Sequence, residues 1–356
     1  MRPWINLMCL LLVVSLACGT SAPVIVEPGS PSQTAAPETA PPIPPGAEGL
    51  FPTANATLNA SIALDISGRY LMSFHACDMN DCQQGPMSHM VYLAQSDDGE
   101  RWSLVPGWQP YRGSVPDVIR RGNMIYVFTP NQMVRYSLTT QTFEGPFQVV
   151  INGMAEGFVD PSLFMDEQGK LVLFFLYGRM GSDPAGCSPG IPTCVQRFGS
   201  ATELEGSDGT QFTLDEGDRV SITVSEGSTL RSASDPDIFF DGAQYFIYIS
   251  HGPSISVWTS AELRGSFVQI TSLPDNLLSL GSGGVPAGYF DDLSGLYWTF
   301  AHAPRRDSAT NIYRAVHSDF SRQIGNADWV VVVSGETLGL GNTINVESPG
   351  FAVNAP

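Results

Sequence analysis

The sequence predicts an all-β protein, a five-bladed β-propeller with about four antiparallel strands in each blade. Short runs of apolar, β-branched and aromatic residues, separated by Gly, Asp and Asn turns, fill the chain from residue 51 to 356. No amphipathic helix pattern of twelve residues interrupts them. One pattern recurs five times, with starts that are 56, 45, 75 and 50 residues apart, and about fifty residues is the size of a propeller blade. These observations together favour a propeller.

The repeat is clearest in "DPSLFMDEQGKLVLFFLYG" from Asp160 and "DPDIFFDGAQYFIYISHG" from Asp235. Both contain Asp-Pro, an apolar triplet, Asp, a turn and an aromatic-rich strand. Three weaker copies start near Asn59, Val115 and Val285. The middle strands of a blade are buried on both faces and lose their polar alternation, as "LVLFFLY" does. We therefore expect residues 51–356 to form the propeller, with residues 206–224 as an extra hairpin of the third blade.

The first fifty residues predict export. One Arg precedes an apolar run that is too short for a membrane-spanning helix, so residues 1–18 read as a secretion signal. The end "SLAC" resembles a bacterial lipobox and favours lipidation of Cys18, with a plain secretion signal as the alternative. Residues 19–50, rich in Pro, Ala, Ser and Thr, predict a disordered tether. We expect an extracytoplasmic protein of the bacterial cell surface or periplasm, attached to the membrane only through its lipid.

The charge balance excludes one class of partner. Acidic residues outnumber basic ones by 35 to 17, and the formal net charge is −18. A protein that binds nucleic acid needs a basic surface, so we expect no nucleic-acid partner. We expect a monomer.

Four cysteines outside the signal form two local pairs. Cys77 and Cys82 flank one short polar loop, and Cys187 and Cys194 flank another. In an exported protein the simplest interpretation is two disulfides, Cys77–Cys82 and Cys187–Cys194. A metal site built from these thiols is the alternative, although no His stands nearby in zinc-ligand order.

The starts of the repeats predict a functional site. The first strand of each propeller blade lines the central channel, so the five starts should form a ring around one channel mouth. Asp160 and Asp235 then lie on adjacent blades, and Asp117 and Asp237 point to the same side of their strands. Asp-Pro is also a common turn opener, which is the structural alternative. Two crowded carboxylates divide into one protonated and one ionised group, as acid–base glycoside hydrolysis requires.

These starts, the second strand "GAQYFIYIS" and the third strand "VWTSAELRGSF" resemble the propeller glycosidases of glycoside hydrolase family 43. That family contains arabinanases, arabinofuranosidases and β-xylosidases, and the resemblance covers roughly residues 51 to 335. It implies an inverting mechanism with an Asp base in the first blade, a pKa-tuning Asp in the third and a Glu acid in the fourth. Asp160 matches the third-blade position, and Asp235 falls within one residue of the fourth. Asn59 stands at the first-blade position and cannot act as a base.

Other residues are candidates for the same site. Asp117 from the second blade or Glu226 upstream of Asp235 would complete the catalytic set. The candidates for substrate binding are Asp237, Glu156, Asn59, His251 and His302. For both histidines a structural role is the alternative.

Two hypotheses follow for the function. The first is a glycoside hydrolase that acts on an oligosaccharide or polysaccharide of the arabinan or xylan type. The second is a lipoprotein that binds a glycan or another ligand at the same mouth without catalysis. No cofactor is required by either hypothesis. Oxygen ligands in the channel are compatible with a structural Ca²⁺, although no loop specifies a metal site.

Overall fold

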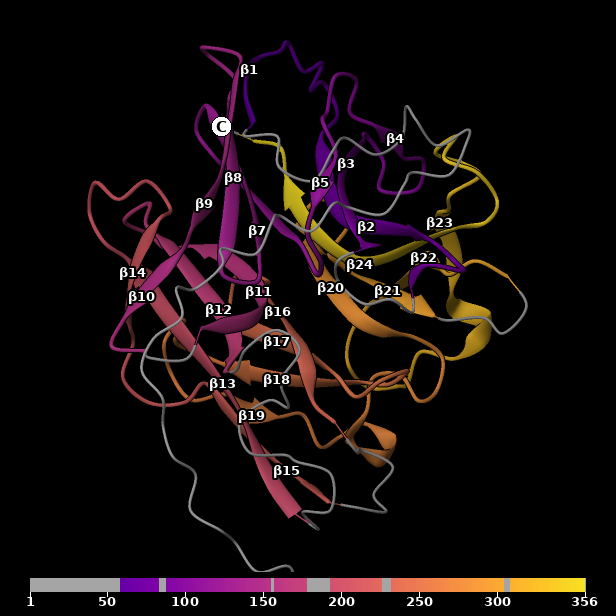
Figure 1. Cartoon of the computed structure of the whole chain (residues 1–356). Helices are drawn as coiled ribbons and strands as arrows, with labels where there is room; N and C mark the ends of the chain where they lie inside the picture. The colour runs from indigo at the N-terminus through magenta and orange to yellow at the C-terminus, as the bar shows by residue number, and fades with distance from the viewer. Residues whose placement is uncertain are drawn as a thin grey trace, which may run out of the picture. The chain divides into compact units, whose positions relative to one another are not determined.

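The computed structural model describes residues 58–82, 88–154, 157–177, 193–225, 232–303 and 308–355. Every described residue belongs to one compact unit, which covers Pro45–Pro356. The predicted signal and tether therefore lie outside the described residues. The strands form five sheets arranged as a five-bladed β-propeller, which confirms the predicted fold (Figure 1). Within the described ranges, no helix has the length and apolar character needed to cross a membrane.

Each blade is named here by its innermost strand. The β6 blade contains β6 (Asp117–Arg121), β7 (Met124–Thr129), β8 (Gln132–Ser137), β9 (Thr142–Gln148) and β1 (Leu58–Ser61). The β11 blade contains β11 (Phe158–Met165), β12 (Leu171–Tyr177), β13 (Thr193–Glu203), β14 (Gln211–Leu214), β10 (Val150–Asn152) and β15 (Val220–Ser225). The β16 blade contains β16 (Ser234–Phe240), β17 (Tyr245–Ser250), β18 (Ile255–Ser260) and β19 (Val268–Gln269).

The two remaining blades complete the ring. The β20 blade contains β20 (Gly284–Asp291), β21 (Leu296–Ala303), β22 (Asn311–His317) and β23 (Val330–Val333). The β24 blade contains β24 (Ile344–Val353), β2 (Tyr70–Asp78), β3 (Met90–Ser96), β4 (Ser103–Leu104) and β5 (Tyr111–Arg112). Two short 3₁₀ helices, Pro274–Asn276 and Asn326–Asp328, lie in the connections.

The innermost strands contact one another in the order β6, β11, β16, β20 and β24, and β24 contacts β6. Both chain-terminal strands contribute to this closure. β24 pairs with β2, so one blade joins the C-terminal strand to strands from the other end of the propeller. β1 pairs with β9 as the outermost strand of the β6 blade. Closure therefore depends on backbone hydrogen bonds between segments that are far apart in sequence.

The prediction that a blade starts at Asn59 is wrong. Asn59 lies in β1 and pairs with Glu144 at the outer edge of the β6 blade. The innermost strand of the remaining blade is β24, and its corner residues are Ser348 and Pro349. The second strand of that blade, β2, does follow the weak repeat, and the closing strand completes it from the C-terminal side.

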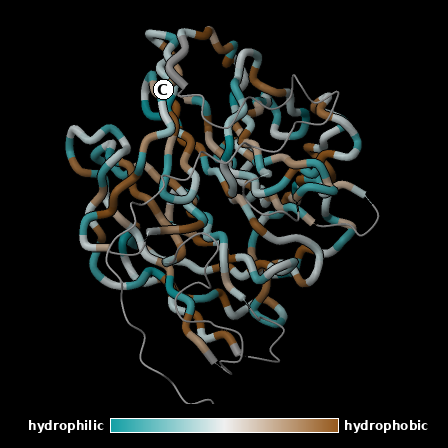
Figure 2. The backbone as a smooth tube through the Cα atoms, viewed as in Figure 1, coloured by the Kyte–Doolittle hydropathy of each residue, from teal (hydrophilic) through white to brown (hydrophobic). Residues whose placement is uncertain are grey.

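Hydrophobic side chains fill the space between neighbouring blades. The residues of β12 from Leu171 to Leu176 are buried, as the loss of alternation in this strand predicts. One core cluster joins Phe74 of β2 to Phe300 of β21 and Trp102, so it spans the β20 and β24 blades. Figure 2 shows hydrophobic segments distributed through all parts of the ring rather than in one centre.

Residues 206–224 contribute β14 and part of β15, but these two strands pair with β13 rather than with each other, so they do not form the expected hairpin. β13 pairs along its N-terminal half with β15 and along its C-terminal end with β14. The predicted disulfide Cys77–Cys82 is present. The second predicted disulfide involves Cys187, which lies outside the described residues.

Candidate functional site

Five X-Pro corners surround one mouth of the central channel. They line a small pocket of about 20 Å³, to which Asp117 and Asp237 also contribute. Each corner residue before the proline has a φ between 47° and 55°, which is unfavourable for residues other than glycine. Because the same strained geometry recurs in all five blades, it is a property of the ring. The corners are Val115-Pro116, Asp160-Pro161, Asp235-Pro236, Val285-Pro286 and Ser348-Pro349.

Side chains of neighbouring strands fix the backbone at four of these corners. The N–H of Val115 donates to His75 Nδ1 at 3.2 Å, and that of Ser348 donates to His302 Nδ1 at 3.0 Å. The N–H of Val285 donates to Ser250 Oγ at 3.0 Å. At the fourth corner the N–H of Asp235 donates to Asp160 Oδ2 at 3.2 Å, so here the acceptor is itself a corner residue. His302 therefore lies beside the mouth and contributes to its shape.

Asp160 and Asp235 form the outer pair of carboxyl groups, and both remain partly exposed. Burial raises the pKa of Asp160 well above its ordinary value, and the charge of Asp235 raises it further. Burial also raises the pKa of Asp235, against hydrogen bonding from Ser234, whose Oγ donates to Asp235 Oδ2 at 2.6 Å, and against the charge of His75. The pair therefore holds a proton more readily than isolated aspartates do.

Asp117 and Asp237 form an inner pair, only 5% and 7% exposed. Asp117 Oδ2 accepts the N–H of Leu163, and Asp237 Oδ2 accepts the N–H of Gly288, each at 2.6 Å. Each carboxyl group thus joins its own blade to the next one. Burial raises the pKa of Asp117 to about 7, and burial together with the charge of Asp117 raises the pKa of Asp237 well above its ordinary value.

Sequence reasoning missed a cluster on the rim beside Ser348. Glu347 pairs across the strands with His75, and His75 Nε2 lies 3.4 Å from Glu347 Oε2. The ring of His75 stacks on that of His89, with centroids 4.2 Å apart. Burial would raise the pKa of Glu347, but the neighbouring imidazoles of His75 and His302 lower it to about 2. Glu347 is therefore ionised at neutral pH.

Burial lowers the pKa of two histidines on this rim, His89 and His302. Burial and the nearby His75 lower the pKa of His89 to about 4. Burial lowers the pKa of His302 to about 4 as well. Both are therefore neutral at physiological pH.

The segment "NVESPGF" is the sequence signal that would have identified Glu347, because its Ser-Pro stands in the place of the Asp-Pro starts.

His251 and Asn59 do not line the pocket at the mouth. His251 is buried, and its two ring nitrogens contact Ser232 O at 2.7 Å and Ser256 Oγ at 2.9 Å, which is the environment of a structural histidine. Asn59 lies on the outer strand β1. Glu156 and Glu226 lie outside the described residues. The described part of the chain contains no group of three or more His, Cys, Asp and Glu residues arranged to hold a metal ion.

No family model and no curated protein matches the chain. Several solved structures match the chain. An endo-1,4-beta-xylanase from Bacteroides thetaiotaomicron VPI-5482 has 15% identity and a TM-score of 0.45, over 84% of this chain and 98% of that one. An exo-1,5-alpha-L-arabinanase from a bovine ruminal metagenomic library has 14% identity and a TM-score of 0.42, over 78% and 99%. The GH43_1 enzyme from Xanthomonas citri, complexed with xylose, has 14% identity and a TM-score of 0.44, over 70% and 82%. This likeness concerns the fold alone.

Proposed function

We propose that the protein is a glycoside hydrolase that cleaves glycosidic bonds at the channel mouth. The observation that carries the proposal is the outer carboxyl pair, in which Asp160 contacts the backbone N–H of Asp235 and both pKa values are raised. A proton shared by two crowded carboxyl groups stays bound at a pH where an isolated aspartate has lost it. Such a proton is available to the leaving oxygen when a glycosidic bond breaks.

The lining of the mouth favours a neutral sugar. Five prolines and two valines supply apolar surface, and the described lining residues include no Lys or Arg. An anionic sugar would meet carboxyl groups without a compensating cation. Neutral pentose glycans of the arabinan or xylan type, which the family resemblance implies, are therefore the proposed substrates.

Hydrolysis of aryl pentosides and of arabino- and xylo-oligosaccharides by the full chain tests this function. Asp160→Asn and Asp235→Asn should each lower kcat/KM by about 10²–10⁴-fold, the usual contribution of a positioned proton donor. Because the donor must be protonated, turnover should fall as pH rises through the raised pKa of the pair. Asp292→Asn, which changes an exposed turn residue, is the matched control. Unchanged turnover in both pair variants would refute the proposed site.

One observation favours the non-catalytic alternative. Asp160 already accepts the N–H of Asp235, so one of the two carboxyl groups also has a role in holding the blades together. A binding protein would show no turnover with any of these substrates. It would still bind an oligosaccharide in calorimetry, and Asp235→Asn would weaken that binding.

We propose further that the protein is exported and lipid-anchored through Cys18. The short apolar run, the "SLAC" sequence and the Pro-rich segment that follows support this proposal. Metabolic labelling with a radioactive fatty acid in a bacterial host tests it. The full chain should incorporate the label, and Cys18→Ser should not. Equal labelling of the two would exclude Cys18 as the attachment point.

A further inference from the structure

The order of blades around the ring places Glu347 in a distinctive position. Asp160 and Asp235 belong to the adjacent β11 and β16 blades. The two blades next to this pair are the β6 and β20 blades, and their corners carry Val115 and Val285. In a ring of five, the one remaining blade lies opposite the pair. That blade is the β24 blade, which carries Glu347 directly before its corner residue Ser348.

The surroundings of Glu347 keep its carboxylate charged and fixed. The side chain is 20% exposed, so solvent reaches it. His75 Nδ1 accepts the N–H of Val115, so Nε2, the ring nitrogen that faces Glu347, is the one that carries a proton. The His75 side chain is only 4% exposed and stacks on His89, which leaves its ring little freedom. His302 and Thr310 are the other polar groups that act on Glu347.

We infer that Glu347 is the general base of the proposed hydrolase and that His75 is its positioning residue. This inference rests on the proposed function. A water molecule between Glu347 and the sugar attacks the anomeric carbon, and Glu347 takes one proton from that water. The bond between the anomeric carbon and the leaving oxygen breaks, and the proton of the Asp160–Asp235 pair goes to that oxygen. Attack from the side opposite the leaving group inverts the anomeric configuration.

A base at Glu347 also explains why the chain does not need a carboxylate at position 59, where Asn59 stands. The first blade in the order of the chain receives its innermost strand from the C-terminal end, so β24 supplies the acidic residue next to the corner of that blade. Asp117, one of the two candidates from the sequence, accepts the N–H of Leu163 and is only 5% exposed, whereas the side chain of Glu347 is 20% exposed.

Kinetics of Glu347→Gln in the full chain test the inference. The variant should lose kcat by about 10²–10⁴-fold with a small change in KM, since the substituted side chain has nearly the same size. Glu336→Gln, which changes an exposed glutamate of a neighbouring loop, should retain activity within about twofold. Glu347→Asp should retain more activity than Glu347→Gln, because the charge is kept. Thermal melting of each variant confirms that it is folded.

The pH profile of His75→Phe tests the positioning role. Glu347 must be ionised to act, so turnover is lost as pH falls through its pKa. Without the imidazole, this pKa should rise from about 2 toward its ordinary value of 4.5, and an acid limb should appear near that pH. Phenylalanine keeps a ring that can stack on His89. A profile identical to that of the unmodified protein would overturn the positioning role.

The outcomes separate the inference from the proposed function. If Asp160→Asn and Asp235→Asn are inactive while Glu347→Gln is as active as Glu336→Gln, the hydrolase proposal stands and Glu347 is not the base. Retention of the anomeric configuration, measured by NMR immediately after cleavage, would also overturn the assignment. If the unmodified protein cleaves none of the substrates, both proposals fail.

Discussion

Four aspartates with similar sequence contexts have different environments in the channel. Asp160 and Asp235 are corner residues, and their side chains reach solvent at the mouth. Asp117 and Asp237 come two residues after a corner, and their carboxyl groups are buried against the backbone of the next blade. The outer pair is therefore suited to chemistry, and the inner pair to holding the ring. Ser162 occupies the same position as the inner aspartates and accepts the N–H of Ile238 at 3.0 Å, so this contact does not need a charge.

The inner pair should make stability depend on pH. Between the ordinary aspartate pKa of 3.8 and about 7, Asp117 is protonated in the folded state and ionised in the unfolded chain. The folded state then binds more protons, so the free energy of unfolding should fall as pH rises through this window. The slope is about 1.4 kcal/mol per pH unit for one proton. Urea unfolding from pH 4 to 7 measures it.

Substitution by asparagine isolates the cause of that slope. Asp117→Asn and Asp237→Asn remove the titrating groups and keep an oxygen that can accept the same N–H. Each should flatten the pH dependence and raise stability near pH 7 relative to the unmodified protein. Asp292→Asn, on the exposed surface, should leave the slope unchanged. A slope that persists in the two channel variants would show that other groups cause it.

At the scale of strands, local patterns predicted most of the fold. The innermost strands β11 and β16 begin at Asp-Pro, and their second strands β12 and β17 are rich in aromatic and branched residues. Such patterns depend only on burial and turn geometry, so they can be read along the chain. The pocket therefore contains Asp160 and Asp235, as the repeats indicated.

The strand pairing that closes the ring could not be predicted from local sequence patterns. β24 belongs to a blade whose other strands lie at the opposite end of the propeller sequence, and no local pattern states which strands will pair. The weak repeat near Asn59 led to a different start for that blade. The correct corner, Ser348-Pro349, carries no Asp, and its acidic residue stands one position earlier. For this reason the contact between Glu347 and His75 became visible only in the folded ring.

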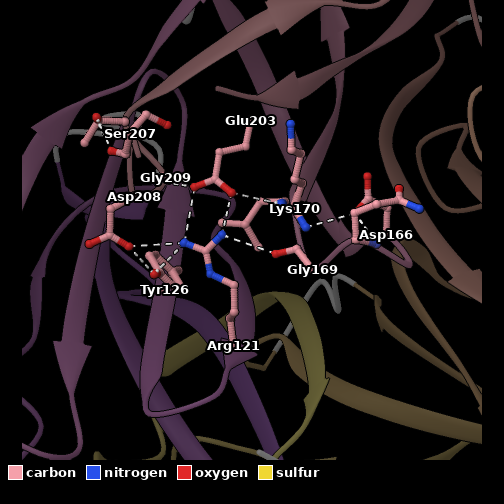
Figure 3. Close-up of polar contacts among 12 residues, drawn as sticks. Arg121, Tyr126, Asp166, Gly169, Lys170, Glu203, Ser207, Asp208 and Gly209 are labelled. Carbon is pink, nitrogen blue, oxygen red and sulfur yellow. Dashed lines mark hydrogen bonds and ion pairs between the residues drawn. The ribbon is translucent and has the colours of Figure 1, made fainter. Parts of the chain in front are cut away.

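At the scale of the whole molecule, neighbouring blades are also joined on the side away from the mouth. β6 begins at Asp117 beside the pocket and ends at Arg121, about 13 Å along the strand. The guanidinium of Arg121 binds the carboxylate of Glu203 from the β11 blade and that of Asp208 from the following turn (Figure 3). Arg135 of the β6 blade binds Asp208 at 2.6 Å. This network links the β6 and β11 blades independently of the channel.

The network predicts that replacing one arginine lowers the free energy of unfolding strongly, whereas replacing another lowers it only slightly. Arg121→Met keeps much of the side-chain volume but leaves Glu203, 5% exposed, without its cation. Glu203 still accepts the N–H groups of Leu171 and Gly209, so the expected loss is about 3 kcal/mol of unfolding free energy. Arg322→Met, which breaks an exposed pair with Asp328, should cost less than about 1 kcal/mol. Urea denaturation at neutral pH compares the two. Similar small losses would mean that packing between the blades, rather than this buried ion pair, holds the β6 and β11 blades together.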